Sequence, residues 1–295
     1  MTNAPEANTD AAWPQPADVI APGTILLAAT PIGNVLDASA RLVFALAQAD
    51  IVAAEDTRRA LNLAGRLGIR IAGKLVAYHE HNEAAQTPWL IEQAQAGQRI
   101  LMISDAGMPC VSDPGYRLIE AAHQSGVPAS IAPGPSAVLT ALALSGMPTD
   151  RWIFEGFMPR KRGEQERFFS TLATQSATTI VFDSPRRLQA TLSHMAEILP
   201  ERQVAVCREL TKTYEDVWVG TPSQLAERAE NARGEIVIVI RGAGEMMVDD
   251  DQAIVEVLAL VDQGMKLKAA ARHVAHQYGL RSRALYQGAL DARQG

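Results

Sequence analysis

From Gly23 onward, short apolar and β-branched runs alternate with longer segments of helical pattern. This alternation predicts β-strands separated by helices, and therefore a sheet of mainly parallel strands. Because helices would then cover both faces of the sheet, its strands read as continuous apolar runs. The strands expected in the first half are Thr24–Ala29, Ile51–Ala54, Leu75–Tyr78, Arg99–Ser104 and Ala129–Ala132. The helices expected between them are Ser39–Ala47, Arg58–Leu67, Thr87–Ala96 and Gly115–Gln124.

The turn at Pro133–Pro135 ends this series, and a second one follows it. No long helix separates Arg208 from Val219, so we expect an antiparallel pair there and a mixed second sheet. Two cores also suit a chain of 295 residues, because single cores stop growing near 250 to 300 residues. The second series consists of a helix at Ser136–Leu144 and strands at Trp152–Glu155, Thr178–Asp183, Gln203–Cys207, Tyr214–Val219 and Glu235–Ile240.

The predicted fold class is α/β, with two α/β domains and a C-terminal helical extension. The expected divisions are a disordered leader at 1–22, an N-terminal α/β domain at 23–134, a C-terminal α/β domain at 135–245 and a helical, basic extension at 246–295. The leader lacks Lys and Arg, unlike a signal or transit peptide. No apolar run approaches the roughly 20 residues of a membrane-spanning helix, so no membrane span is expected.

Charge is distributed unevenly along the chain. The chain has 27 Lys+Arg and 33 Asp+Glu, a net charge of -6, which argues against a wholly basic, nucleic-acid-binding surface. From Gly264 onward, however, six Lys+Arg and one acid give +5. Lys268, Arg272 and His276 recur four apart, and a short helix at Ser282–Ala292 completes a helix-turn-helix outline that could contact phosphates. The alternative is a solvated basic face on a segment that merely packs on the domain.

The ends of the predicted strands are rich in turns and polar residues. In open α/β sheets, ligands bind at the carboxyl ends of the strands. Three common signatures are absent: a phosphate loop ending in Gly-Lys-Ser/Thr, Gly-x-Gly-x-x-Gly and Gly-x-Ser-x-Gly. Nucleotide hydrolases, the usual dinucleotide enzymes and serine hydrolases are therefore disfavoured. The loops of interest are Ala29–Asn34, Ala54–Arg59, Tyr78–Glu83, Ile103–Gly115 and Ala132–Ala137.

These loops allow both functional and structural interpretations. Glycine turns admit a ligand close to the backbone, and Asp105 or Asp113 can accept from hydroxyl or ammonium groups. Plain turns, and a helix cap at Asp56, are the structural alternatives. His79 and His81 lack a third ligand at zinc-site spacing, so we expect no metal and favour proton handling or substrate positioning.

Two cysteines, Cys110 and Cys207, are too few for a disulfide framework and suit a reducing cytoplasm. In the second half of the chain, the cations of Arg160–Arg162 and Arg186–Arg187 suit phosphate oxygens, although surface charge is the simpler explanation.

Together these segments resemble the ribosomal RNA small-subunit methyltransferase I family, over about Gly23 to Leu290. The motifs that carry the resemblance are Ala29–Asn34, Glu55–Arg58, Tyr78–Glu83, Ser104–Gly107 with Ser112–Gly115, Pro133–Ala137, Phe154–Phe157 with Pro159–Lys161, and Arg208–Lys212. Two departures stand out. Met108 replaces a usual Thr on the cofactor side, and Phe182–Arg187 replaces a Tyr-Glu-Ser-Pro-His-Arg stretch on the substrate side.

The resemblance implies the tetrapyrrole-methylase fold, whose two α/β domains hold S-adenosylmethionine in the cleft between them, usually in a homodimer. It implies methyl transfer to a cytidine ribose 2'-hydroxyl of 16S ribosomal RNA, within the small ribosomal subunit, in the cytoplasm. A tetrapyrrole (precorrin-type) methyltransferase shares the fold but would not need Tyr78–Glu83 or the basic extension. A non-catalytic RNA-binding protein is a further alternative, and the intact glycine loops argue against it.

The resemblance also implies roles for particular residues. Candidates for the base that takes the hydroxyl proton, among which the sequence does not choose, are Glu55, Asp56, His79, Glu80 and Glu209. Residues expected to bind the cofactor are Pro31, Gly33, Ser104, Asp105, Ala106, Gly107, Met108, Asp113, Ser136, Ala137, Leu210 and Ile236. Residues expected to bind RNA are Arg58, Arg160, Lys161, Arg162, Arg186, Lys212, Lys268, Arg272, Arg281 and Arg283.

Overall fold

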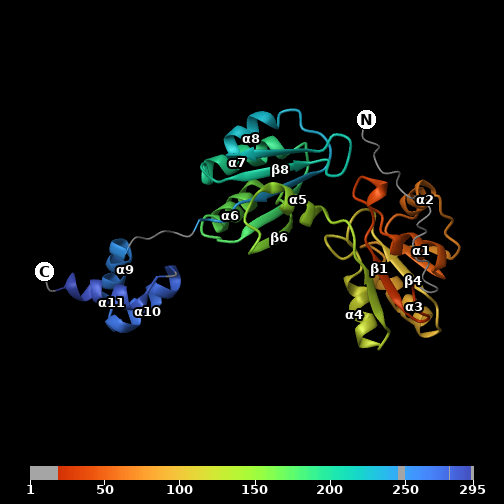
Figure 1. Cartoon of the computed structure of the whole chain (residues 1–295), viewed down its shortest axis with the longest axis horizontal. Coiled ribbons are helices and arrows are strands. Elements are labelled where there is room, and N and C mark those ends of the chain that lie inside the picture. Colours follow the sequence, from red (N-terminus) through yellow and green to blue (C-terminus); the bar gives the residue numbers. More distant parts are fainter. Residues whose placement is uncertain (1–18, 245–249, 279, 294–295) are drawn as a thin grey trace, which may run out of the picture.

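The computed structural model describes residues 19–244, 250–278 and 280–293. Within these residues the chain forms two α/β domains, each built on a five-stranded sheet, and a small helical unit (Figure 1). The predicted architecture is thus confirmed. Because the expected boundary at 245/246 falls in 245–249, it lies outside the described residues.

The first sheet is entirely parallel, with strand order β3-β2-β4-β1-β5. The three inner strands are apolar and completely buried, as continuous apolar runs predict. The edge strands differ, because each has a neighbour on one side only, and β5 is exposed at its first three residues. The strands are β1 (Ile25–Ala28), β2 (Ile51–Ala54), β3 (Lys74–Ala77), β4 (Ile100–Ile103) and β5 (Ala129–Ala132).

Helices cover both faces of this sheet. Leu42 and Leu46 of α1 pack on one face, and Leu90 of α3 and Leu118 of α4 pack on the other. Asp56 caps α2, because its carboxylate accepts from the Arg58 N–H at 2.8 Å; the structural alternative for this residue is therefore realised. The helices are η1 (Val35–Asp37), α1 (Ala40–Gln48), α2 (Thr57–Arg66), α3 (Glu83–Gln95) and α4 (Tyr116–Gln124).

Two expectations for the first domain were wrong. Helix α3 begins at Glu83 and not at Thr87, and Pro88 lies inside it. Thr87 donates to the Glu83 carbonyl at 2.7 Å and contacts the buried Tyr78 hydroxyl at 2.8 Å, so tertiary contacts hold this turn. The expected leader also ends too late, because Ile20 is 1% exposed and its carbonyl accepts from Arg99. The rest of that leader, 1–18, lies outside the described residues.

The second sheet is mixed, with strand order β6-β7-β10-β8-β9. Strands β6 and β7 are parallel and the other pairs are antiparallel, including the expected β8–β9 pair. The strands are β6 (Trp152–Phe157), β7 (Thr178–Asp183), β8 (Val204–Arg208), β9 (Asp216–Gly220) and β10 (Ile236–Ile240). The helices of this domain are α5 (Ala137–Ser145), α6 (Arg162–Leu172), α7 (Leu188–Ile198) and α8 (Pro222–Arg228).

The two faces of the second sheet have different roles. Helices α6, α7 and α8 pack on one face through Phe169, Leu192 and Leu225. On the other face, Val138 and Leu142 of α5 pack in a core that also contains Ile32, from the loop after β1. An apolar core therefore joins the two domains, and it places the loop after β1 beside the second sheet.

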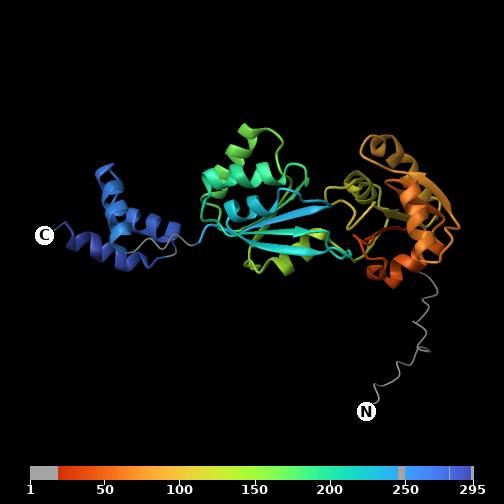
Figure 2. The same ribbon diagram turned by 90° about the horizontal axis from the view of Figure 1, so that it is seen from above.

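The C-terminal unit consists of α9 (Asp250–Asp262), α10 (Leu267–Tyr278) and α11 (Ser282–Asp291). It has its own core, to which Val257, Val274 and Leu285 contribute. Lys268 and Arg272 are exposed, as the expected periodicity requires, whereas the side chain of His276 lies outside those described. Figures 1 and 2 show this unit apart from both sheets. Among the described helices, none is both long enough and apolar enough to span a membrane.

Candidate active site

The loop after β1 contacts the loop after β8 in the other domain. The Asn34 N–H donates to Thr211 Oγ1 at 3.1 Å. A Cβ on Gly33 would lie 2.5 Å from Lys212 Cγ and 2.9 Å from the Leu210 carbonyl oxygen. Only glycine permits this approach, so Gly33 sets how closely the two domains meet.

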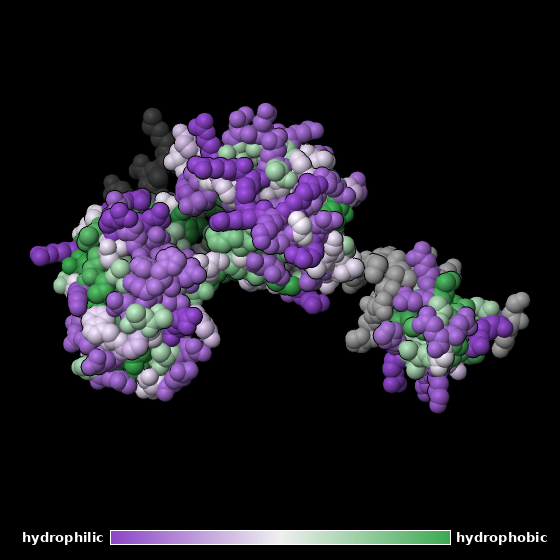
Figure 3. All heavy atoms as spheres, turned by 180° about the vertical axis from the view of Figure 1, so that it is seen from behind, coloured by the Kyte–Doolittle hydropathy of each residue, from purple (hydrophilic) through white to green (hydrophobic). Residues whose placement is uncertain are grey.

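Two cavities lie along this junction. In Figure 3, hydrophobic surface is visible where the two sheet domains meet, with hydrophilic residues on either side. The larger cavity has a volume of about 890 Å³ and the smaller one about 570 Å³. The residues that line both are Ile32, Arg59, Asp105, Ala106 and Glu235. The two cavities therefore share a wall, and the loops after β1, β2 and β4 contribute to it.

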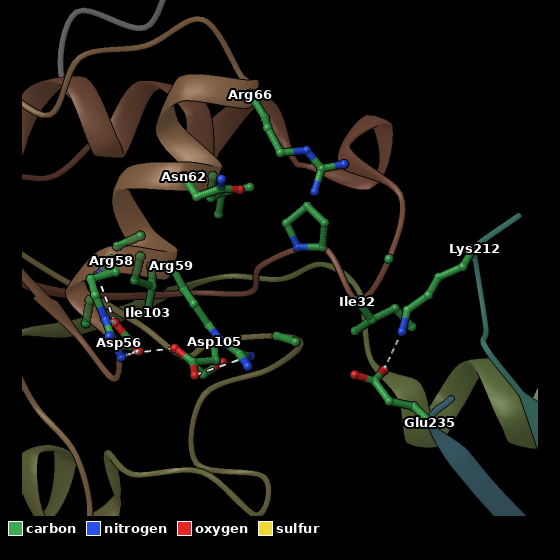
Figure 4. Close-up of a pocket in the computed structure, with 17 residues that line it drawn as sticks. Ile32, Asp56, Arg58, Arg59, Asn62, Arg66, Ile103, Asp105, Lys212 and Glu235 are labelled. Atoms are coloured by element: carbon green, nitrogen blue, oxygen red, sulfur yellow. Dashed lines mark hydrogen bonds and ion pairs between the residues drawn. The ribbon is translucent and has the colours of Figure 1, made fainter. Parts of the chain in front are cut away.

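Hydrogen bonds couple the loops after β2 and β4 across this wall. The Asp56 N–H donates to Asp105 Oδ1 at 3.0 Å, and the Asp105 N–H donates to Glu55 Oε2 at 3.2 Å. Arg59 pairs with the other oxygen of Asp105 at 3.4 Å. Figure 4 shows Asp56, Arg59 and Asp105 lying together at one side of the smaller cavity. These bonds fix the directions in which the Glu55 and Asp105 carboxylates point.

Asp113 is a further carboxylate of the larger cavity, which Glu55, Asp105, Asp183 and Glu235 also line. Burial, the largest cause, and the nearby charges of Glu55 and Asp105 together raise the pKa of Asp113 to about 7, against a hydrogen bond from Ser104 that lowers it. The Glu55, Asp105 and Asp113 carboxylates therefore lie close together in the larger cavity, where they suit a cationic group of a ligand. Within the described residues, no group of three or more His, Cys, Asp and Glu could hold a metal ion.

Non-glycine residues with positive φ angles occur in two loops that border the cavities. Among the described residues, the non-glycine cases are Cys110, Ser112, Glu209 and Thr211, at 71°, 62°, 51° and 65°. Such conformations cost of order 1–3 kcal/mol each and persist where the surroundings enforce them. Their position after β4 and β8 indicates that these two loops are held in a functional shape.

Cations constrain two of the other candidate bases. A hydrogen bond from Arg58 lowers the pKa of Asp56 to about 2. A hydrogen bond from Lys212 likewise lowers the pKa of Glu209, whose carboxylate also accepts from the Glu235 N–H at 2.9 Å. A proton acceptor works best with a pKa near the operating pH, so both carboxylates are poor bases.

The loop after β7 forms the second-domain side of the larger cavity. The buried Asp183 side chain pairs with Arg187 and accepts from Thr191. Arg187 also donates to the Met158 carbonyl at 3.3 Å, which ties the loop after β6 to the loop after β7. Arg186 also lines this cavity.

The structure brings most of the expected cofactor-binding residues to the two cavities. Those that line one or both are Pro31, Gly33, Ser104, Asp105, Ala106, Asp113, Ala137 and Ile236. The other four lie beside them. Gly107 exchanges backbone hydrogen bonds with Thr30, Leu210 is buried near Gly33, Ser136 caps α5, and Met108 is partly buried in the loop after β4.

The expected bases are dispersed. Glu55 lines the larger cavity and Asp56 the smaller one, whereas Glu209 lies behind Lys212 and Glu235. His79 and Glu80 occupy the loop between β3 and α3 and line neither cavity. The Nδ1 atom of His79 is buried without a hydrogen-bond partner.

The expected RNA-binding residues fall into three groups. Arg58 and Lys212 line the smaller cavity, and Arg160 and Arg186 the larger one. Lys161 and Arg162, at the start of α6, pair with Glu164 and Glu197. The remaining four, all exposed on the helical unit, are Lys268, Arg272, Arg281 and Arg283.

Sequence reasoning missed several residues of the site. Arg59, Asn62 and Arg66 all line the smaller cavity from α2, and their three- and four-residue spacing could have identified this face. Phe157 and Phe182 contribute an apolar face to the larger cavity and contact each other edge-to-face at 5.4 Å. Their position at the ends of β6 and β7 was the available signal.

Comparisons with known proteins agree with this geometry. Residues 24–226 match the family model of Tetrapyrrole (Corrin/Porphyrin) Methylases, and residues 248–293 match that of the RsmI C-terminal HTH domain. The chain is 44% identical over 275 residues to ribosomal RNA small subunit methyltransferase I of Mycobacterium tuberculosis, covering 92% of this chain and 96% of that relative. The protein of the same name from Mesorhizobium japonicum is 43% identical over 91% of this chain and 92% of its own length.

The chain belongs to the ribosomal RNA small subunit methyltransferase I family. Solved structures agree on the fold alone. The methyltransferase CobJ aligns with a TM-score of 0.57 at 20% identity, covering 75% of this chain and 95% of its own. Uroporphyrin-III-C-methyltransferase of Thermus thermophilus aligns with a TM-score of 0.53 at 19% identity, over 74% and 94%. In this chain, the two cavities thus lie between the two α/β domains of a tetrapyrrole-methylase fold.

Proposed function

We propose that this chain transfers a methyl group from S-adenosylmethionine to the 2'-hydroxyl of a cytidine ribose in the 16S RNA of the small ribosomal subunit. Family membership and the names of its relatives support the methyltransferase and the RNA substrate. The observation that carries the proposal is the wall shared by a cavity with a carboxylate cluster and aromatic surface and a cavity that α2 lines with three arginines. Transfer of labelled methyl groups to isolated small subunits tests it.

The larger cavity fits S-adenosylmethionine by the chemistry of its residues. Phe157, Phe182 and Ile236 supply apolar surface for the adenine ring, and Asp113 can accept from an ammonium group. The cluster of Glu55, Asp105 and Asp113 carboxylates suits a sulfonium cation. When bound, the cofactor supplies an electrophilic methyl carbon.

The chain's own residues have two tasks in this reaction. The first is to hold the ribose hydroxyl in line with the methyl group, about 3 Å away, because methyl transfer to oxygen is an in-line displacement. The loops that form the shared wall are fixed by the Asp56–Asp105 and Asp105–Glu55 hydrogen bonds, and they suit this task. The second task is to accept the hydroxyl proton as the new bond forms.

Glu55 is our candidate for the proton acceptor. Of the five residues proposed from sequence, it alone lines the larger cavity, and no described cation forms an ion pair with it. Asp113, with a pKa of about 7, shares the negative field of Glu55. Asp113 can therefore hold a proton near neutral pH, beside a Glu55 carboxylate that forms no ion pair with a described cation.

Glu55→Gln is expected to reduce kcat by about 100-fold, because a positioned base contributes about 10² to 10⁴ in rate. S-adenosylmethionine affinity should fall by a much smaller factor, because Glu55 is one of several carboxylates that line the larger cavity. Single-turnover methyl transfer and calorimetry measure the two quantities. Glu80→Gln is the matched control, because Glu80 is exposed and lines neither cavity. Equal rates in the two variants would remove Glu55 from this role.

Cofactor affinity is expected to rise with pH through about 7. In the free protein the pKa of Asp113 is about 7, and a bound cation would lower it, so that binding releases a proton. Below pH 7 affinity should fall by up to about tenfold per unit. S-adenosylhomocysteine, which lacks the sulfonium charge, should show a smaller change. Calorimetry over this pH range checks both, and a flat profile for the wild type, equal to that of Asp113→Asn, would contradict the assignment.

RNA recognition is assigned to two surfaces. Arg58 and Lys212 face the smaller cavity, and Lys268 and Arg272 are exposed on α10. Basic side chains on an exposed helix provide phosphate contacts whose strength falls with salt. The helical unit therefore serves to hold the ribosomal subunit while the two α/β domains perform the transfer.

We further assign the chain to a homodimer in the cytoplasm. Exposed apolar side chains occur on three consecutive elements, at Ile131 of β5, Leu139 and Leu144 of α5, and Trp152 of β6. Strands β5 and β6 are also edges of their sheets. Large exposed apolar residues beside unpaired sheet edges favour a protein partner, and a second copy is the commonest one.

A further inference from the structure

One face of α2 forms a side of the smaller cavity. Arg58, Arg59, Asn62, Leu63 and Arg66 line the cavity from this helix. The helix contains three arginines and no acidic residue. A surface of this composition provides positive charge and hydrogen-bond donors in one direction, which suits an anionic ligand.

The charges in this cavity are balanced unevenly. Arg58 pairs with Asp56 at 2.8 Å and Arg59 with Asp105 at 3.4 Å. Lys212 pairs with Glu209 and Glu235 at 2.8 and 3.1 Å. In the part of the chain that the structure describes, no carboxylate forms an ion pair with Arg66, whose side chain is exposed. Arg66 is therefore the cation of this cavity whose charge is left for a ligand.

Arg66 also lies away from the reacting centre. Arg59 belongs to the wall shared by the two cavities. Arg66 lies seven positions further along the helix, a rise of roughly 10 Å. Figure 4 shows the Arg66 side chain lying apart from Asp56 and Asp105, on another side of the cavity. Leu63 lines the cavity between them, and Ile32 adds a second apolar side chain. The cavity thus runs from the shared wall, over apolar surface, to an unpaired guanidinium.

We propose that the smaller cavity holds the nucleotide next to the target cytidine, with Arg66 contacting its backbone phosphate. This inference rests on the proposed function, which places the target ribose at the shared wall. The RNA strand continues beyond that ribose. The next phosphate along the strand is best bound by a cation that has no ion-pair partner within the protein. The planar guanidinium of Arg66 matches two phosphate oxygens, while the Asn62 amide can both donate to and accept from the adjacent ribose or base.

The test compares Arg66→Ala with Arg66→Lys and with Arg70→Ala. Arg70 is an exposed arginine four residues further on that lines neither cavity. Filter binding of purified small ribosomal subunits is measured over a series of salt concentrations, and S-adenosylmethionine binding is measured by calorimetry. Arg66→Ala should raise the subunit Kd by about 5- to 10-fold and reduce the salt slope by about 0.7 to 0.9, as loss of one phosphate contact requires. Arg66→Lys should restore the slope, and cofactor affinity should be unchanged in all three variants.

The outcomes separate this inference from the proposed function. If wild-type protein methylates the subunit but Arg66→Ala matches Arg70→Ala in Kd and salt slope, the phosphate subsite is overturned and the proposed function stands. If Arg66→Ala weakens S-adenosylmethionine binding, the smaller cavity serves the cofactor and the inference is again overturned. If wild-type protein neither binds nor methylates the subunit, the proposed function itself fails.

Discussion

Ala106→Trp is expected to abolish methyl transfer by weakening S-adenosylmethionine binding at least 100-fold. Ala106 is exposed and lines both cavities, so an indole at this position would fill the space where they meet. The indole would occupy space that the bound cofactor needs, so either the cofactor or the adjacent backbone must move. Most of the binding free energy of the cofactor would therefore be lost. Calorimetry measures the affinity, and labelled-methyl transfer measures the activity.

The control for this variant is Ala84→Trp. Ala84 is also an exposed alanine, on the first turn of α3, and it lines neither cavity. Because both changes add the same side chain at an exposed position, both proteins should unfold at about the wild-type temperature. Normal cofactor binding by folded Ala106→Trp would mean that the cofactor lies elsewhere, and the assignment of the larger cavity would be abandoned.

The second large effect is expected for the double charge reversal Lys268→Glu with Arg272→Glu. Both residues are exposed on α10, one turn apart, and no ion pair involving either is found among the described residues. Removing two phosphate contacts and adding two repulsive charges should lower kcat/KM for small subunits by about 100-fold and reduce the salt slope by nearly two. Cofactor affinity should remain at the wild-type value, because the helical unit contributes to neither cavity.

The matched control reverses Arg70 and Arg151 in the same way. Both are exposed arginines that line neither cavity, and the change in net charge is identical. A general loss of electrostatic attraction would weaken both double variants equally. A loss confined to the variant of Lys268 and Arg272 would locate the contact on α10, whereas equal behaviour of the two proteins would leave the helical unit without the proposed role.

Much of the fold could be predicted from sequence because its strands are buried on both faces. Ile51–Ala54 and Ile236–Ile240 are uninterrupted apolar runs, and both are strands with those same bounds. Prediction failed where tertiary contacts override local signals. The turn before Pro88 is helical because Thr87 forms hydrogen bonds with Glu83 and Tyr78. Ile20 is buried, and its carbonyl accepts a hydrogen bond from Arg99.

The site was only partly accessible from sequence, for a related reason. Four of the five loops singled out from sequence contribute to the cavities, since Gly and Pro residues stand at the ends of buried strands, whereas Tyr78–Glu83 lines neither cavity. The choice between carboxylates was not accessible, because it depends on contacts between distant residues. Glu55 is separated from Asp105 by 50 positions, and Lys212 reaches Glu235 from another loop. These contacts between distant residues determine which carboxylate forms an ion pair with a cation and which is available as a proton acceptor.

Ribose methylation of small-subunit RNA by this protein can be measured in a single assay. Small ribosomal subunits from cells that lack this protein are incubated with purified protein and S-adenosylmethionine labelled in the methyl group, and the RNA is then hydrolysed in alkali. A 2'-O-methyl group blocks cleavage of the adjacent phosphodiester. We therefore expect label in an alkali-resistant dinucleotide that contains cytidine. Label on a base, or no transfer by protein that binds the cofactor, would contradict it.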